Sequence, residues 1–209
     1  MWDDRYKASE DYLFGTVPAG VLLENPGWFK PGERALCVSD GEGRNSVHLA
    51  ELGLNVTAFD MAPTAVDRAR ALAADKGVSV DFHVSEWQSW DWAAAGYDLA
   101  VAIFIQYADP SARARQFADL RSAVRPGGVL LLHGYTPEQV DYGTGGPGNP
   151  AHMYTEGLLR DAFGGWHIQR LAAYERDVNE GEGHSGRSAL IDLIARKPAP
   201  KPRQPNQRA

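Results

Sequence analysis

The chain has 209 residues, of which 44% are hydrophobic and 23% charged, an ordinary composition for one globular domain. Its formal net charge of −6 gives no electrostatic reason to bind nucleic acid or an anionic membrane, and no apolar segment approaches the ~20 residues that a membrane helix needs. The polar start does not resemble a secretory signal, and the lone Cys37 excludes an internal disulfide or a site of several thiolates. These features predict a protein of the reducing cytoplasm without a metal site.

Residues 1–30 carry many aromatic side chains before the first clear strand pattern. They are Trp2, Tyr6, Tyr12, Phe14, Trp28 and Phe29. A free arm would leave these rings in water, so we expect one or two short helices that fold over a neighbouring site. The chain then divides into a helical cap segment (1–30), one α/β domain (31–197) and a basic, proline-rich tail (198–209) that we expect to be disordered.

The most informative stretch joins a predicted strand to a predicted helix. The apolar run 35–38 is typical of a buried parallel strand, and residues 46–52 are typical of a helix. The junction between them reads Ser39-Asp40-Gly41-Glu42-Gly43-Arg44-Asn45. Its two glycines allow a tight turn that a ligand can approach closely, and the helix N-terminus offers free N–H groups.

Two further acids follow predicted strands. Asp60 follows the strand pattern 55–59, where a carboxylate can accept hydrogen bonds from both hydroxyls of a ribose. Glu86 follows the pattern 79–84, in a position suited to the exocyclic amine of an adenine. Ligands of such sheets bind outside the carboxyl ends of the strands, so the acids and the glycine turn predict an adenosine-type cofactor site. The alternative is a turn that merely closes a strand–helix unit.

The charge of the turn favours one cofactor of this type. The turn lacks the third glycine of the dinucleotide fingerprint, whose position is held by Ser46. It also carries Asp40 and Glu42 with only Arg44 to offset them. Two carboxylates would repel a diphosphate, whereas S-adenosylmethionine (SAM) has no phosphate and carries a sulfonium and an ammonium. The residues therefore favour SAM over a nicotinamide dinucleotide.

Strand and helix patterns alternate along the rest of the chain. A helix follows Pro63, the apolar run 99–105 predicts a central strand, and Asp109 with Pro110 predicts the start of another helix. Residues 128–133 predict the fifth strand and 156–163 a shorter helix. The last strands, 166–178 and 188–196, have no helix between them, so they should form an antiparallel hairpin. The predicted fold is α/β: a doubly wound, mostly parallel seven-stranded sheet with an antiparallel C-terminal edge hairpin.

Taken in order, these pieces resemble the class I SAM-dependent methyltransferases, in particular the small enzymes grouped with tellurite-resistance and thiopurine methyltransferases. The matching pieces are 36–45, Phe59-Asp60-Met61, Ser85-Glu86-Trp87, 97–101 and 120–128, and the likeness covers residues 1–197. There are departures from the family pattern. Cys37 stands where the family has an acid, Ser39 where it has the first glycine of its turn, and Glu86 in place of an aspartate.

The resemblance implies a Rossmann-like methyltransferase fold with SAM as cofactor. It places Asp60 on the ribose and Glu86 on the adenine, and Asp40 is a candidate to face the ammonium. The expected cofactor-binding residues are Ser39, Asp40, Gly41, Glu42, Gly43, Arg44, Asn45, Asp60, Met61, Glu86, Trp87, Ile103 and Gln106.

Methyl transfer from a sulfonium is an in-line displacement, so alignment and exclusion of water matter more than a fixed set of acids and bases. The candidate catalytic residues are Tyr107, His133 and His184. The other interpretations are a core tyrosine, a strand-end histidine bonded to backbone and an exposed turn histidine. The glycine-rich stretch 143–148 and the loop that carries His184 are expected to close the mouth together with residues 1–30.

The predicted function is methyl transfer from SAM to a small-molecule acceptor. Residues 105–110 lack the Asn/Asp-Pro-Pro-Tyr/Phe motif of amino-methylating DNA enzymes, and the chain has no Pro-Cys nucleophile, so no nucleic-acid partner is expected. Two alternatives stay open: an NAD-dependent oxidoreductase, and a SAM-binding module without catalysis. We expect a monomer or a homodimer without a membrane partner.

Overall fold

A single mixed sheet organises the computed structural model, which describes residues 2–93, 96–181 and 184–200. The strand order is β3-β2-β1-β4-β5-β7-β6. Its strands are β1 (Arg34–Val38), β2 (Asn55–Asp60), β3 (Asp81–Val84), β4 (Tyr97–Ile103), β5 (Val124–Tyr135), β6 (His167–Asn179) and β7 (Ser185–Arg196). β1 to β5 pair in parallel, whereas β7 runs antiparallel to both β5 and β6. The predicted fold class, including the antiparallel edge hairpin, is confirmed.

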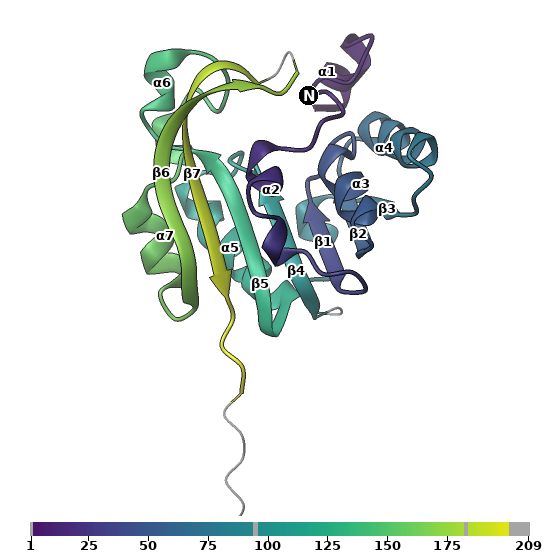
Figure 1. Cartoon of the computed structure of the whole chain (residues 1–209). Coiled ribbons are helices and arrows are strands. Elements are labelled where there is room, and N and C mark those ends of the chain that lie inside the picture. The colour runs from purple at the N-terminus through teal and green to yellow at the C-terminus, as the bar shows by residue number, and fades with distance from the viewer. Residues whose placement is uncertain (1, 94–95, 182–183, 201–209) are drawn as a thin grey trace, which may run out of the picture.

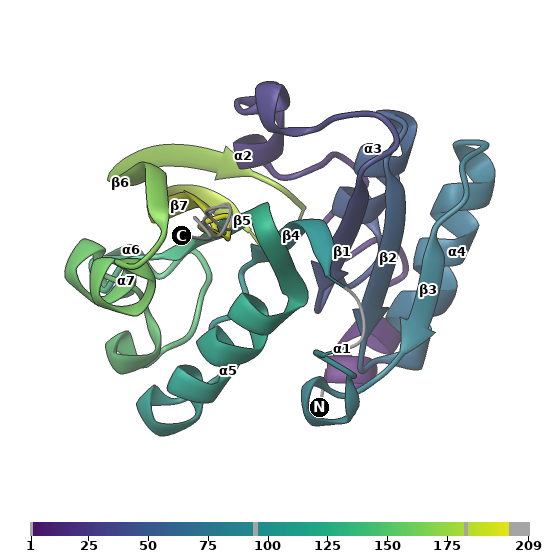
Figure 2. The same ribbon diagram turned by 90° about the horizontal axis from the view of Figure 1, so that it is seen from below.

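Helices cover both faces of the sheet (Figures 1 and 2). α2 (Gly20–Leu23) and α3 (Arg44–Glu51) lie on one face, with α4 (Pro63–Asp75) beside α3, while α5 (Pro110–Ala123) and α7 (Glu156–Phe163) lie on the other. α1 (Trp2–Ala8) lies at the end of the sheet where the parallel strands finish, and α6 (Gln139–Tyr142) packs near the start of β7. Two layers of helices around a parallel sheet leave the carboxyl ends of the strands as the open edge.

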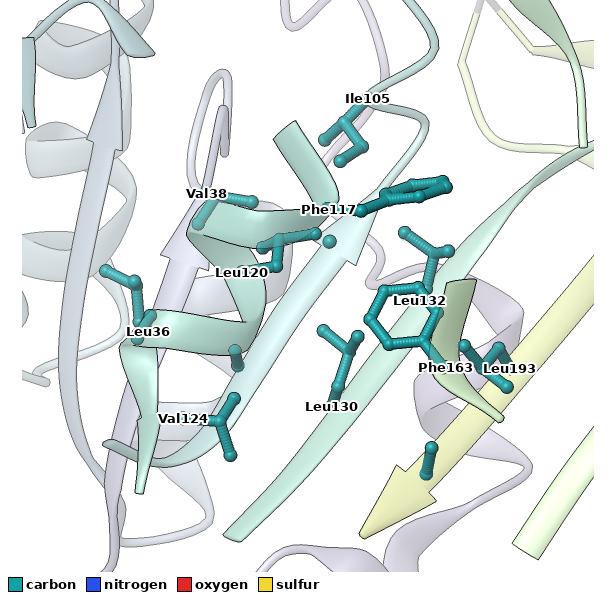
Figure 3. Close-up of a cluster of buried hydrophobic side chains, with 14 of the residues drawn as sticks. Leu36, Val38, Ile105, Phe117, Leu120, Val124, Leu130, Leu132, Phe163 and Leu193 are labelled. Carbon is teal, nitrogen blue, oxygen red and sulfur yellow. The ribbon is translucent and has the colours of Figure 1, made fainter. Parts of the chain in front are cut away.

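The largest cluster of buried apolar side chains lies between the sheet and the helices α5 and α7 (Figure 3). Leu36, Leu130 and Leu132 reach it from the strands, and Phe117 and Phe163 reach it from the helices. All five side chains are at most 3% exposed. This packing fixes β1, β4 and β5 side by side, so the loops that follow these strands meet at one edge.

Local capping sets the helix starts as the sequence indicates. The carboxylate of Asp109 accepts hydrogen bonds from the backbone N–H groups of Ser111 (2.8 Å) and Ala112 (2.9 Å), and Pro110 occupies the first turn of α5. The hydroxyl of Thr155 accepts from the N–H of Leu158 at the start of α7. α7 has the predicted limits, because its cap and its apolar face are both local signals.

Several element limits differ from the sequence prediction. α3 begins at Arg44 rather than at residue 46, and β3 begins at Asp81 rather than at residue 79. β5 extends from Val124 to Tyr135, beyond the predicted 128–133, because Val124 and residues 129–133 pair with β4 and residues 129–135 pair with β7. Cross-strand hydrogen bonds thus hold polar and glycine residues in a strand that apolar patterning does not mark. The predicted disordered tail falls, from residue 201 onward, outside the described residues.

Across the described part of the chain, no helix combines the length and the apolar character required to cross a bilayer.

Candidate active site

A cavity of about 440 Å³ opens at the carboxyl ends of the parallel strands. Its volume is within the roughly 300–1,000 Å³ typical of small-molecule sites. The lining side chains come from the N-terminal segment, the turns after β1, β2, β3 and β4, and the β6–β7 turn. They are Trp2, Tyr6, Phe14, Ser39, Asp40, Gly41, Arg44, Asn45, Asp60, Met61, Ser85, Glu86, Trp87, Gln88, Ile103, Phe104, Tyr107 and His184.

The turn after β1 has the backbone shape that a closely approaching ligand requires. Ser39 (φ 47°), Gly41 (φ 63°) and Gly43 (φ 88°) all lie in the left-handed region. A Cβ on Gly41 would stand 2.8 Å from the Tyr6 hydroxyl, and one on Gly43 would stand 2.7 Å from the Cβ of Ala69. Ser39 thus adopts a backbone conformation that residues other than glycine rarely adopt, a strained state that recurs at functional sites.

Asp60 is held in the cavity by the backbone. Its Oδ2 accepts a hydrogen bond from the Gly41 N–H (3.0 Å) and its Oδ1 from the Ala62 N–H (2.9 Å). Each carboxylate oxygen has two lone pairs, so Asp60 can accept a further hydrogen bond from a ligand. Burial raises the pKa of Asp60, although these hydrogen bonds oppose the rise. A ligand that donates a hydrogen bond from a hydroxyl suits this group.

Asp40 is a second carboxylate on the cavity wall. Burial raises its pKa to about 7, the hydrogen bond from the Ser46 hydroxyl opposes the rise, and the nearby charge of Asp60 adds to it. A carboxylate with such a pKa gains most from a cationic ligand, because a positive charge favours its ionised form.

Other residues expected at the cofactor lie along the same wall. Met61 is 45% exposed and Glu86 is exposed, whereas Trp87 is buried and donates from Nε1 to Oδ2 of Asp119 (3.0 Å). Ile103, at the end of β4, also lines the cavity. The structure therefore brings together side chains from four separate strand ends.

Three residues of the expected cofactor set do not line the cavity. Glu42 is 3% exposed and pairs with Arg68 on α4 at 2.7 Å, because its side chain turns away from the open edge toward that guanidinium. Gly43 packs against α4. Gln106 bridges to the strand beside it: its amide donates to the backbone oxygen of Tyr135 (2.8 Å) and accepts from the N–H of the same residue (2.7 Å).

His133 also lies outside the cavity lining. It is 1% exposed, and its Nδ1 is 2.7 Å from Oδ1 of Asp192 on β7, its direct cross-strand partner. Asp192 also accepts hydrogen bonds from Arg170 (2.8 Å) and Tyr174 (3.1 Å). Burial alone would raise the pKa of Asp192, but the bonds from His133 and Arg170 hold it below the ordinary value. His133 belongs to a buried polar network that joins three strands.

Tyr107 and His184 do line the cavity. Tyr107 is 45% exposed, and its hydroxyl is 3.1 Å from that of Ser39, so it is not a core residue. His184 is buried, with its ring centroid 4.6 Å from Phe14 and 4.1 Å from Phe104. Burial, reinforced by the charge of Arg44, lowers the pKa of His184 to about 3, so its imidazole is neutral at physiological pH.

Sequence patterns missed several lining residues. Phe104 falls inside a continuous apolar run, yet it has a φ of 55° and turns its ring between His133 and His184. A positive φ at a phenylalanine is not readable from the sequence. Ser85 and Gln88, beside the expected Glu86, also line the cavity.

The stretch 143–148 does not line the cavity, contrary to its expected place at the mouth. The Thr144 hydroxyl donates to the backbone oxygen of Arg187 and accepts from the Gln139 amide (2.9 Å), so this stretch is bound to the beginning of β7.

Among residues 2–93, 96–181 and 184–200, no group of three or more His, Cys, Asp or Glu side chains is arranged to hold a metal ion.

Comparison with known proteins gives a consistent assignment. Residues 35–128 match the family model described as a methyltransferase domain. An uncharacterised protein of Mycobacterium tuberculosis is 29% identical over 66% of this chain and 50% of its own length. A ubiquinone biosynthesis O-methyltransferase of Xanthomonas axonopodis pv. citri is 38% identical over 48% of this chain and 42% of its own length. The chain thus spans half or less of the length of these curated relatives.

Solved structures share the fold at low sequence identity. A protein studied for the conversion of a disulfide bond into a thioacetal group during echinomycin biosynthesis has a TM-score of 0.76 and 21% identity, with 96% of this chain and 91% of that chain covered. TehB from Haemophilus influenzae has a TM-score of 0.69 and 17% identity, with 88% and 63% covered. Residues 35–128 therefore match a methyltransferase domain, and the chain shares its fold with solved SAM-dependent methyltransferases.

Proposed function

We propose that this protein is a SAM-dependent methyltransferase that acts on a small-molecule acceptor. The observation that carries the proposal is the set of charges on the cavity wall. Asp40, Asp60 and Glu86 line it, whereas its cation, Arg44, is paired with Glu180 at 2.7 Å. These charges suit a cofactor with a sulfonium and an ammonium, and they oppose a diphosphate.

The residues present fit this cofactor. The turn tolerates no side chain at Gly41, where a Cβ would stand 2.8 Å from the Tyr6 hydroxyl, and the Asp60 carboxylate can accept a further hydrogen bond from a ribose hydroxyl. We assign Glu86 to the adenine amine, Trp87 and Ile103 to the sides of the base, and Asp40 to the cationic end. When bound, SAM supplies a methyl carbon activated by its sulfonium leaving group.

The protein's part in the reaction is to align the acceptor and to exclude water. The N-terminal segment lines the cavity with three aromatic side chains, those of Trp2, Tyr6 and Phe14. We assign Tyr107 and His184, which also line the cavity, to the acceptor. In this proposal residues 1–30 act as a cap on the catalytic domain 31–197, and the basic tail has no part in the chemistry.

The same proposal places the protein in the cytoplasm as a monomer or homodimer that does not use nucleic acid. The net charge of −6 and the buried single thiol of Cys37 support it.

Calorimetry with SAM and NADH, followed by a screen for release of S-adenosylhomocysteine (SAH), tests the function. We expect SAM to bind, NADH not to bind, and at least one thiol or phenol acceptor to release SAH. Binding of NADH in place of SAM would indicate an oxidoreductase. Tight SAM binding without SAH release from any acceptor class would indicate a silent SAM-binding module.

A further inference from the structure

We propose that the half of the cavity around His184 binds an uncharged aromatic acceptor that carries a hydroxyl or thiol group, and that His184 positions this group by hydrogen bonding. The inference rests on the proposed function and names its substrate class. It depends on three independent features of the described residues: aromatic rings in contact with His184, buried polar atoms without a partner, and the absence of an available cation.

Aromatic rings surround His184 on several sides. The centroids of Phe104 and Phe14 lie 4.1 and 4.6 Å from that of His184, and Tyr6 packs edge-on against Phe14 at 6.3 Å. Phe14 and Tyr6 line the cavity together with Trp2 and Phe104. Such walls present flat apolar faces, which favour a planar ligand through offset or edge-to-face ring contacts.

Two buried polar atoms in this cluster have no hydrogen-bond partner. They are Nδ1 of His184 and the hydroxyl oxygen of Tyr135, whose rings lie 5.8 Å apart and both contact Phe104. A buried polar atom without a partner destabilises the folded state by about 1–3 kcal/mol, so such atoms usually serve a ligand or an ordered water. One hydroxyl or thiol in this region, directly or through a water, would satisfy them.

The charges exclude the other acceptor classes. Among the described lining residues the only Lys or Arg is Arg44, which is 6% exposed and bonded to Glu180 and to the backbone oxygen of Val17. An anionic acceptor, such as an oxyanion of selenium or tellurium, therefore finds no free counter-charge and meets three carboxylates on the wall. A cationic acceptor would be repelled by the sulfonium next to it. An uncharged acceptor avoids both penalties.

The transfer balances with this arrangement. The new bond joins the acceptor oxygen or sulfur to the methyl carbon, and the breaking carbon–sulfur bond leaves its electron pair on sulfur, so neutral SAH forms. The acceptor proton passes to water. Since the pKa of His184 is lowered to about 3, its imidazole remains a neutral hydrogen-bonding group and does not store this proton. At saturating SAM, the rate should therefore follow the ionisation of the acceptor and show no inflection near the ordinary histidine pKa of about 6.5.

Matched acceptor pairs test the proposal with the full-length protein. The uncharged probes are 2-naphthol and benzyl mercaptan, the carboxylated partners are 6-hydroxy-2-naphthoate and 4-(mercaptomethyl)benzoate, and the inorganic probes are selenite and tellurite. SAH release gives kcat/KM, and calorimetry with the SAH complex gives affinity. Each uncharged probe should have a kcat/KM and an affinity about tenfold higher than those of its carboxylated partner, a difference of about 1.4 kcal/mol.

The variant His184→Phe keeps a ring but removes the polar atoms. We expect it to raise KM for 2-naphthol about tenfold, with SAM affinity unchanged, and the exposed His167→Ala serves as the control. Equal or better turnover or affinity with the anionic probes, or an unaltered KM in His184→Phe, would overturn the proposal. The proposal is also overturned if neither uncharged aromatic probe binds better than its carboxylated partner. Failure of SAM itself to bind would instead refute the proposed function.

Discussion

Glu180, just after β6, and Arg44, in the first turn of α3, form an ion pair of 2.7 Å although 136 residues separate them in sequence. Both side chains are at most 10% exposed. The other oxygen of Glu180 accepts from the N–H of Gly20 (3.0 Å), and Asn45 accepts from the N–H of Ala19 (2.9 Å). The helix behind the cofactor turn, the N-terminal segment and the hairpin are therefore joined at one point beside the cavity.

Glu180→Gln tests this junction. The substitution leaves the Arg44 guanidinium buried without its charge partner, which should lower the free energy of unfolding by about 3 kcal/mol. Urea denaturation measures the loss. Glu175→Gln is the matched control, because Glu175 pairs with Arg187 in an exposed ion pair that should contribute little. Equal stability of the two variants would mean that the Arg44–Glu180 pair does not hold these segments together.

Asp60→Ala should weaken SAM binding by roughly one to two orders of magnitude, because it removes charge-assisted hydrogen bonds worth about 1–3 kcal/mol. Glu42→Gln is the control in the neighbouring turn. Glu42 is buried against Arg68 outside the cavity, so its loss should lower the melting temperature and leave SAM affinity almost unchanged. Calorimetry and thermal unfolding separate the two effects. A Glu42 variant that loses affinity as strongly as Asp60→Ala would place both acids at the cofactor.

Asp40 should make SAM binding depend on pH. Its pKa in the free protein is about 7, above the ordinary value of 3.8, so the carboxyl is largely protonated below pH 7. A cationic ligand favours the carboxylate, so binding should release a proton, and affinity should fall about tenfold per pH unit below about 7. Calorimetry in buffers of different ionisation enthalpy counts the protons. Asp40→Asn should flatten the profile, and an equally steep profile in that variant would assign the proton to another group.

The same shift affects stability without a ligand. A carboxyl whose pKa is raised in the folded state binds more protons folded than unfolded between about pH 4 and 7. The free protein should therefore lose stability as the pH rises through this window, and SAM should restore part of it above pH 7. Melting temperatures with and without SAM at pH 5 and pH 7.5 follow both changes.

The sequence by itself determined the order of strands and helices and the position of the glycine turn after β1. These depend on local physics: apolar runs mark buried strands, Asp109 caps its helix through neighbouring N–H groups, and Gly41 and Gly43 permit left-handed backbone at the turn. The antiparallel hairpin also followed locally, from two strand patterns without a helix between them.

The tertiary structure alone decided which side chains of these motifs reach the cavity. Asp40 and Glu42 are two residues apart, yet Asp40 lines the cavity and Glu42 meets Arg68 of α4. His133 meets Asp192, a partner 59 residues later, whereas His184 comes to the cavity because the long hairpin returns over the sheet edge. Phe104 reaches the cavity beside His184 only because its backbone turns there, with a φ of 55°. The direction of a side chain and its bonding partner depend on contacts between segments that are distant in sequence. A sequence pattern contains no information on these distances.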